Sequence, residues 1–287
     1  MKAARGRRTG IFMPYFRGDR LSDFPAALAG ILEKENVHYH DAVYLNANGS
    51  NYVKPATEEL LLKVHSPDMI NAVKTIGHFE AASYSAGGTV QATLEIQEGN
   101  LDNAFVFTGF GDHHAGKNYF GGGCYFNGAA LAIAALREKE VRRFAIIDTD
   151  SHHADGTRDI FRLDRDVLHL CFCFQDYGDK YNNVDVGIPY GTPDVHYLQK
   201  VTDEVMPRIE AFQPSFIFWE FGYDATAGEY GDKGLTKDCH VGIAKIIKTA
   251  ADRFCRGRLI TILCGGSRRD LATYIIPKII AVLAEVD

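Results

Sequence analysis

Apolar segments and amphipathic segments alternate along most of the chain. Short runs that are almost continuously apolar cover residues 10–16, 103–110, 142–150, 166–174, 214–222 and 258–266. Segments with apolar residues at every third or fourth position, the periodicity of a half-buried helix, cover residues 21–36, 87–99, 126–140, 194–212, 236–254 and 274–286. Runs without strict apolar–polar alternation are typical of parallel strands that are buried on both faces. The pattern therefore predicts an α/β fold, a single three-layer αβα domain with a mostly parallel sheet.

Composition narrows the class of protein. No repeat or Pro/Gly/Ser-rich linker divides the 287 residues, so we expect one domain over residues 1–287. The basic residues 1–8 lack the apolar stretch of a secretory signal and are expected to form a frayed tail, and no window approaches the ~18–20 apolar residues of a membrane span. The net charge of −6 argues against a dedicated nucleic-acid or anionic-membrane binder. The six scattered cysteines indicate reduced thiols and a cytoplasmic protein.

Ionisable residues gather where four of the predicted strands end. The polar segments that follow those strands cover residues 111–123, 148–157, 223–232 and 264–270. In a parallel sheet the carboxyl ends of strands share one edge, where ligands bind. Asp150 and His152 are two positions apart, so they point to the same side of an extended segment, and Asp224 follows a second strand. Two carboxylates and one imidazole can hold a divalent metal and leave positions open for water, as catalytic sites do.

These motifs resemble the histone deacetylase family, which includes acetoin-utilisation proteins and acetylpolyamine amidohydrolases and has an arginase-like fold. The resemblance runs from about residue 20 to residue 280 and includes VHSPDMI (64–70), SAGGTVQA (85–92), DHHAGKNYFGGGCYFNGAALA (112–132), DTDSHHADGT (148–157), GYDATAG (222–228) and CGGSRRDLA (264–272). It implies one divalent metal ion, zinc or alternatively iron(II), held by Asp150, His152 and Asp224.

The paired histidines His113 and His114 are the candidate acid–base groups. Amide hydrolysis needs a base for the attacking water and an acid for the leaving amine, and an imidazole can serve as both. The resemblance implies that Asp148 holds His113 and that Asp155 holds His114. His114 is then the expected proton shuttle and His113 an electrostatic support, while His153 is expected to be structural.

The resemblance also implies a monovalent cation such as potassium beside the metal loop. Its ligands would be Asp148 and the main-chain carbonyls of Asp150, His152, Cys171 and Phe172. Cys171 stands where a serine is usual in the family.

Two positions depart from the family pattern. The family usually has a tyrosine in the last Gly-rich loop, where it polarises the amide carbonyl, but this chain reads LCGGSRRDLA. Arg268 or Arg269 is our first candidate for the replacement, Tyr223 or another tyrosine from elsewhere is the second, and a weak hydrolase or binding module is the third. Gly123 stands where an aromatic residue usually narrows the acyl-lysine tunnel. A wider, partly cationic entrance would suit a small acidic N-acyl substrate.

The sequence thus predicts a metal-dependent hydrolase of a linear amide bond, an N-deacylase acting on a small molecule or an acylated lysine. One alternative is a catalytically impaired metal-binding protein that recognises acylated ligands without turnover. Another is a two-metal amidinohydrolase, which would need aspartates where this chain has Ala154 and Thr226. The oligomeric state is left open, with a homo-oligomer among the possibilities.

Overall fold

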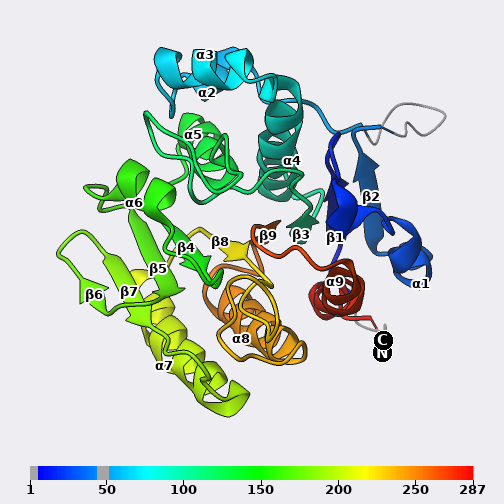
Figure 1. Ribbon diagram of the computed structural model, residues 1–287, viewed down its shortest axis with the longest axis vertical. Coiled ribbons are helices and arrows are strands. Elements are labelled where there is room, and N and C mark those ends of the chain that lie inside the picture. The colour runs from blue at the N-terminus through cyan, green and yellow to red at the C-terminus, as the bar shows by residue number, and fades with distance from the viewer. Residues whose placement is uncertain (1–5, 44–51, 287) are drawn as a thin grey trace.

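A nine-stranded sheet forms the middle layer of the part of the protein that the structure describes (Figure 1). The structure is a computed structural model and describes residues 6–43 and 52–286. The strand order is β2-β1-β3-β9-β8-β4-β5-β7-β6, and neighbours are parallel except for β6 and β7. The strands are β1 (Thr9–Met13), β2 (Val37–Asp41), β3 (Asn103–Val106), β4 (Phe144–Asp148), β5 (Val167–Cys173), β6 (Tyr177–Gly178), β7 (Asn183–Gly187), β8 (Phe216–Phe221) and β9 (Leu259–Leu263).

Helices cover both faces of this sheet. One face carries α2 (Glu58–Leu61), α3 (Pro67–Thr75), α4 (Phe79–Gln97), α5 (Gly128–Glu138) and α6 (Asp155–Phe161), and the other carries α1 (Ala29–Leu32), α7 (Asp194–Phe212), α8 (Cys239–Phe254) and α9 (Arg269–Ala284) (Figure 1). Each face has its own apolar core. The predicted three-layer α/β architecture is therefore confirmed.

The central strand β8 shows how one sequence fills both cores. Ile217 and Trp219 lie in the core beneath α7, α8 and α9, whereas Phe216 and Phe218 lie in the core on the side of α4 and α5. Because successive side chains point to opposite faces, a strand between two cores must be apolar at nearly every position. Glu220 interrupts this run, although it is fully buried.

Six of these strands lie within the six predicted runs, and the strands that sequence analysis missed, β2, β6 and β7, lie towards the two edges of the sheet. Strands at or next to the edge of a sheet contact less of the core. The sequences of β2 (VHYHD) and β7 (NVDVG) accordingly lack a continuous apolar run. The helix expected over 21–36 is also wrong in extent, because only two 3-10 turns and the four-residue helix α1 form in and around this segment. Pro25 and Gly30 both weaken a helix there.

The amino-terminal tail is more ordered than expected in its described part. Arg7 forms an ion pair with Asp252 at 2.9 Å, and Arg8 forms one with Asp102 at 2.8 Å. Residues 6 to 8 of the tail predicted as frayed are thus tied to the domain, while residues 1–5 lie outside the described part. Within the described residues, no helix has the length and apolar character needed to cross a bilayer.

Candidate active site

Neighbouring strands bring the predicted metal ligands together. Strands β4 and β8 pair in parallel, so the loops that leave their carboxyl ends meet above the sheet. The first loop carries Asp150 and His152 and leads into α6, and the second carries Asp224. The Nδ1 atom of His152 lies 3.0 Å from Asp150 Oδ1 and 2.8 Å from Asp224 Oδ2.

The charges of these three groups compensate one another. Burial opposes ionisation of Asp150, but the nearby His113 and His152 outweigh it, and the pKa of Asp150 lies well below its ordinary value. Burial, together with the charge of Asp150, raises the pKa of Asp224 to about 6. The hydrogen bonds to these two carboxylates raise the pKa of His152 to about 10. Two buried carboxylates thus converge on one nitrogen, which is an arrangement that a divalent cation stabilises.

Two glycines keep space around the carboxylates. A Cβ atom at Gly222 or at Gly265 would lie 2.3 Å from Asp150 Oδ2. The backbone N–H of Gly265 donates to the same oxygen at 2.7 Å, and Ser151 N–H donates to Asp224 Oδ1 at 3.1 Å. The donor set and its glycine cradle fit one divalent ion with three protein ligands.

The paired histidines contact the aspartates that the resemblance implied. His113 Nδ1 lies 2.7 Å from Asp148 Oδ2, and His114 Nδ1 lies 2.5 Å from Asp155 Oδ1. The two imidazole rings are 4.1 Å apart between centroids. The His113 side chain is only 3% exposed, whereas that of His114 is 21% exposed, so His114 is the more accessible of the two.

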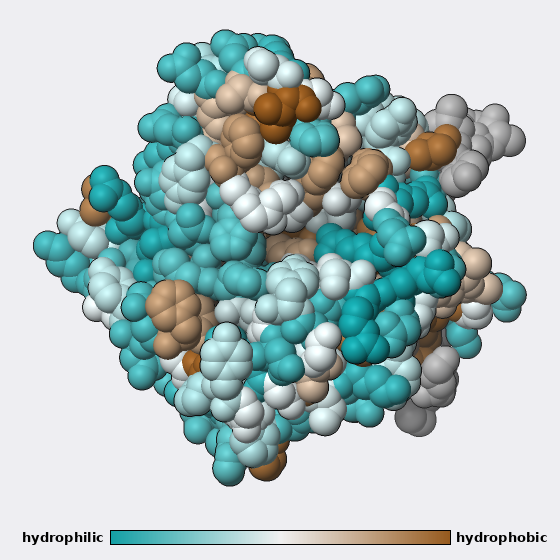
Figure 2. Space-filling model, viewed as in Figure 1, coloured by the Kyte–Doolittle hydropathy of each residue, from teal (hydrophilic) through white to brown (hydrophobic). Residues whose placement is uncertain are grey.

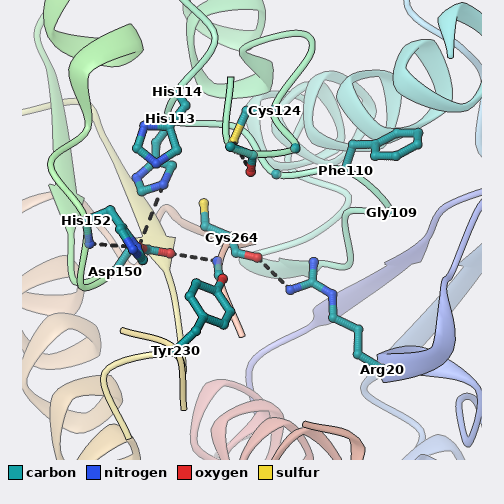
Figure 3. Close-up of a pocket in the computed structure, with 14 residues that line it drawn as sticks. Arg20, Gly109, Phe110, His113, His114, Cys124, Asp150, His152, Tyr230 and Cys264 are labelled. Atoms are coloured by element: carbon teal, nitrogen blue, oxygen red, sulfur yellow. Dashed lines mark hydrogen bonds and ion pairs between the residues drawn. The ribbon is translucent and has the colours of Figure 1, made fainter. Parts of the chain in front are cut away.

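A cavity of about 280 Å³ opens above these groups (Figure 3). Both histidines, Asp150 and His152 line it, together with Arg20, Gly109, Phe110, Gly111, Gly122, Gly123, Cys124, Tyr230, Cys264 and Gly265. Gly123 thus lies on the wall where sequence analysis placed it. A Cβ atom at Gly122 would lie 2.5 Å from His114 Cδ2. Residue 122 must therefore have no side chain if His114 is to keep its position.

The predicted arginines do not contribute to this cavity. Arg268 forms an ion pair with Asp270 at 2.7 Å and Arg269 forms one with Asp23 at 3.1 Å, and their side chains are 45% and 53% exposed. Both residues lie at the start of α9, where they face solvent, and the cavity wall includes neither. The structure therefore gives no support to an arginine as the replacement for the missing tyrosine, and that role stays a prediction.

Tyr223 is not at the cavity either. It is fully buried, and a Cβ atom at Gly266 would lie 2.4 Å from its ring. The ring belongs to the apolar core beneath α8 and α9. Its proposed contact with substrate is therefore not supported.

Tyr230 is the tyrosine that does reach the cavity, and sequence analysis missed it. Its ring stacks on the metal-ligand candidate His152 with 5.5 Å between centroids (Figure 3). Its hydroxyl oxygen accepts a hydrogen bond from Gly266 N–H at 2.9 Å. Although the residue as a whole is 62% exposed, desolvation of its hydroxyl and the charges of Asp150 and Asp224 raise the pKa of Tyr230. The hydroxyl therefore stays protonated at neutral pH.

The position of Tyr230 depends on its neighbour Glu229. This carboxylate accepts hydrogen bonds from the backbone N–H groups of Ser267 and Arg268 at 2.9 and 2.6 Å, and from Ser267 Oγ at 2.8 Å. These contacts hold the loop after β8 against the Gly-rich loop. The only signal in the sequence was the motif GEYGD at residues 228–232, in which Tyr230 lies six residues beyond Asp224, and its partners lie in a distant segment.

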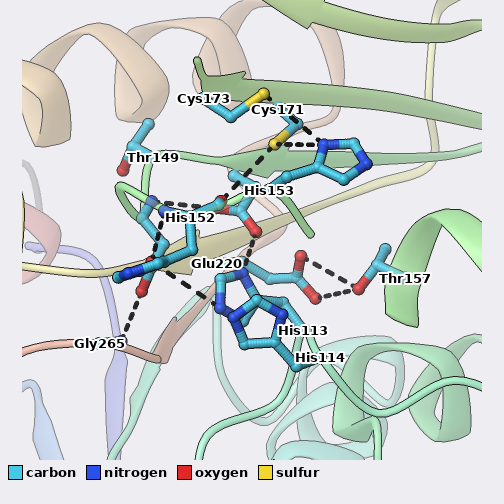
Figure 4. A network of polar contacts seen from close by, with 12 residues as sticks. His113, His114, Thr149, His152, His153, Thr157, Cys171, Cys173, Glu220 and Gly265 are labelled. Atoms are coloured by element: carbon cyan, nitrogen blue, oxygen red, sulfur yellow. Dashed lines mark hydrogen bonds and ion pairs between the residues drawn. The ribbon is translucent and has the colours of Figure 1, made fainter. Parts of the chain in front are cut away.

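Glu220 is a second buried group that sequence analysis missed. It lies opposite Asp148 in the register of β8 and β4, and Thr157 Oγ1 donates to its carboxylate at 2.9 Å (Figure 4). Burial and the neighbouring Asp148 raise the pKa of Glu220 far above its ordinary value. A charged residue inside the run FIFWEF was the signal for it. Burial and the charge of Asp150 likewise raise the pKa of Asp148, the partner of His113, well above its ordinary value.

The potassium site stays a prediction. Cys171 Sγ lies 3.9 Å from the carbonyl oxygen of His152. A thiol is a poor ligand for a hard cation, so only main-chain oxygens at this position would serve potassium.

Comparisons with known proteins agree with this geometry. A family model described as the histone deacetylase domain matches residues 26–283. A probable deacetylase of Archaeoglobus fulgidus is 31% identical over 210 residues, which are 67% of this chain and 57% of the relative. A histone deacetylase-like amidohydrolase of Pseudomonas aeruginosa is 30% identical over 246 residues, which are 74% of this chain and 64% of the relative. The chain thus spans less than two thirds of the length of either relative.

A solved structure shows the same fold. The crystal structure of the HDA15 HD domain superposes with a TM-score of 0.78 at 23% sequence identity, covering 92% of this chain and 83% of that chain.

Proposed function

Because this chain belongs to the histone deacetylase family, we propose that it is a metal-dependent hydrolase that removes an acyl group from a nitrogen through one divalent metal ion. Asp150, His152 and Asp224 would hold the ion, with zinc as our first choice and iron(II) as the alternative. A metal bound there supplies a water of lowered pKa and polarises the amide carbonyl. The observation that carries the proposal is the position of His114 on the same cavity wall as Asp150 and His152.

The two imidazoles have different tasks in this proposal. The Nδ1 atom of His114 donates to Asp155, so its Nε2 atom has a free lone pair and can accept the proton of the attacking water. The imidazolium then delivers this proton to the leaving amine. His113, held by the buried Asp148, supports the charge that develops beside it.

Tyr230 takes the place of the tyrosine that the Gly-rich loop lacks. Its oxygen already accepts a hydrogen bond from Gly266, so its own O–H is free to donate to the substrate carbonyl. Stacking on His152 places this hydroxyl on the side of the metal-ligand candidates. The donor comes from the loop after β8, although the family has it in the loop after β9.

The alternatives have weaker support. Ala154 is fully buried, and Thr226 Oγ1 is already hydrogen-bonded to Tyr223 O and His240 Nε2, so neither position offers a ligand for a second metal in an amidinohydrolase. The acidic N-acyl substrate rested on a cationic entrance, and the arginines invoked for it are paired with carboxylates away from the cavity. A wide entrance at Gly123 and one cationic side chain of the cavity lining, Arg20, remain in favour of that hypothesis.

The proposed function is tested by metal content together with acetate release. The purified protein is offered acetylated lysine peptides, acetylpolyamines and N-acetyl amino acids, and we expect metal-dependent release of acetate that His114→Ala reduces at least 100-fold. Binding of an acylated ligand without release of acetate would identify the impaired metal-binding protein. Release of urea by a protein with two metal ions in this site would identify an amidinohydrolase.

The role of Tyr230 has its own test. Tyr230→Phe removes one hydroxyl, and loss of such a donor lowers kcat by about 10²–10³. We expect KM and metal content to change little, and binding of a trifluoromethyl ketone analogue, which is hydrated like the tetrahedral intermediate, to weaken in parallel. Tyr190→Phe, at a side chain that is 82% exposed, is the matched control. A normal kcat in Tyr230→Phe, with a large loss in Arg268→Ala, would favour the arginine instead.

A further inference from the structure

A second cluster of ligand-type side chains lies behind the metal loop, outside the cavity. It consists of His153, from the loop that also carries His152, of Cys171 and Cys173 on β5, and of Asp185 on β7 (Figure 4 shows the histidine and the cysteines). Cys171 and Asp185 are partners in the register of β5 and β7. The four candidate ligand atoms lie within 4.8 Å of one another.

The three separations from His153 Nδ1 to the other ligand atoms are compatible with tetrahedral coordination. His153 Nδ1 lies 3.6 Å from Cys173 Sγ, 3.8 Å from Cys171 Sγ and 3.6 Å from Asp185 Oδ1. Zinc bonds of about 2.3 Å to sulfur and 2.0–2.1 Å to nitrogen or oxygen, at tetrahedral angles, put a nitrogen and a sulfur ligand about 3.6 Å apart and a nitrogen and an oxygen ligand about 3.4 Å apart. The observed values equal these or exceed them by about 0.2 Å.

Hydrogen bonding accounts for only part of this arrangement, in which Cys171 Sγ can donate to the carbonyl oxygen of His152 at 3.9 Å and Arg158 donates to Asp185 Oδ1 at 2.5 Å. All three separations converge on the same nitrogen, His153 Nδ1, which can carry one proton and so can donate to only one partner. The 3.6 Å separation from the Asp185 oxygen is too long for a hydrogen bond. A triad of a thiol, an imidazole and a carboxylate would use both ring nitrogens, whereas this cluster uses one.

Charge and burial also suit a metal. Cys171, Cys173 and Asp185 are buried, and Arg158 Nη2 lies 2.5 Å from Asp185 Oδ1. With two thiolates, one carboxylate, one arginine and one divalent cation, the cluster is neutral overall, as a buried site should be. Thiolate and imidazole ligands together select zinc among the common cellular divalent ions.

We propose that His153, Cys171, Cys173 and Asp185 form a closed, structural zinc site that is distinct from the site at Asp150, His152 and Asp224. Four protein ligands leave no open position, so this ion would not take part in hydrolysis. It would tie the loop of His153 to β5 and β7. His152 directly precedes His153 in that loop. The ion at the second site would therefore also hold in place one of the candidate ligands of the ion at the first site.

The test counts zinc ions per chain in protein purified under reducing conditions. We expect two in the unaltered protein, one in Cys171→Ser/Cys173→Ser, and one in Asp224→Asn. Cys255→Ser, at a buried cysteine outside the cluster, is the matched control and should keep two. A lower Tm is expected for the double cysteine variant than for Cys255→Ser.

A second measurement leaves the cluster unaltered, in case the double variant does not fold. Cobalt(II) replaces zinc in Asp224→Asn, and we expect one cobalt per chain with a thiolate-to-cobalt charge-transfer band in the near ultraviolet. One zinc in the unaltered protein, none in Asp224→Asn and no thiolate band would overturn the proposal. The zinc count in Asp224→Asn and the thiolate band report on the second site alone, so both are expected whether or not the first site holds zinc or hydrolyses an amide.

Discussion

At Gly265 a single hydrogen atom in place of a side chain makes room for the metal-ligand candidates. The residue lies in the Gly-rich loop after β9, where a Cβ atom would approach Asp150 Oδ2 to 2.3 Å and the carboxyl carbon of Asp224 to 2.8 Å. Real Cβ atoms do not approach so closely, and the two carboxylates cannot retreat because they are buried. The missing side chain is therefore as much a part of the site as the ligands.

We predict that Gly265→Ala loses the metal of the active site while the protein stays folded. The methyl group must push Asp150 or Asp224 away from His152, and ligand positions need to be correct to within ~0.2 Å for tight binding. Metal affinity, measured by competition with a chelating dye, should fall at least tenfold. The control is Gly30→Ala, where a Cβ atom meets nothing within 4 Å. Unchanged affinity in Gly265→Ala would show that the carboxylates can move.

At the scale of elements, side chains at helix starts join the loops around the site. Asn127 precedes α5 and is fully buried, and its side-chain oxygen accepts from Ala130 N–H at 2.8 Å. Its amide donates to Thr157 Oγ1 of α6 at 2.9 Å, and Thr157 in turn donates to Glu220 of β8. One residue thus connects two helices with the strand that leads to Asp224.

We predict that Asn127→Ala lowers the free energy of unfolding by about 2–4 kcal/mol. Loss of a capping side chain costs about 1 kcal/mol, and the unsatisfied buried partner adds about 1–3 kcal/mol. Ser66→Ala is the comparison, because Ser66 caps α3 by a 3.2 Å bond to Met69 N–H without a buried side-chain partner and should cost about 1 kcal/mol. Urea unfolding of both variants measures the difference. Equal losses would mean that the bond to Thr157 adds nothing.

At the scale of the whole molecule, buried neutral histidines make stability depend on pH. Burial lowers the pKa of His65 and of His240 to about 4, from an ordinary value of 6.5. His65 Nε2 accepts a hydrogen bond from Asn127 N–H at 3.1 Å, so a proton on that nitrogen would break the bond. Between pH 4 and 6.5 the unfolded chain binds more protons at these positions than the folded chain does.

We predict that the contribution of His65 and His240 to the free energy of unfolding is fully present above pH 6.5 and is lost as the pH is lowered towards 4. Each of the two histidines contributes up to about 3 kcal/mol to this loss, because one pKa unit corresponds to about 1.4 kcal/mol. Urea unfolding between pH 7 and 4.5, with a chelator present so that metal release does not contribute, measures the slope. His65→Gln should show a shallower slope than His38→Gln, in which an exposed histidine is replaced. Parallel slopes would contradict the assignment.

Local sequence was enough to predict the parts of the fold and of the site that depend on near neighbours. Central strands such as β8 are buried on both faces, so their sequences are apolar and can be recognised as strands from the sequence. Asp150 and His152 are two positions apart in one loop, so their relation to each other was visible. The edge strand β2 and the next-to-edge strand β7 were not predicted, because strands that contact less of the core have fewer apolar residues to reveal them.

The sequence by itself determined the α/β class, the run of strands and helices, and the residue types that can hold a metal and move a proton. Only the tertiary structure decided which side chains reach the cavity: it turns Arg268 towards solvent, buries Tyr223 in the core and brings in Tyr230. The physical reason is that these positions depend on contacts between distant segments, such as Glu229 with the backbone of Ser267 and Arg268. A pattern along the chain records periodicity and burial, but it does not record which loops meet at the edge of the sheet.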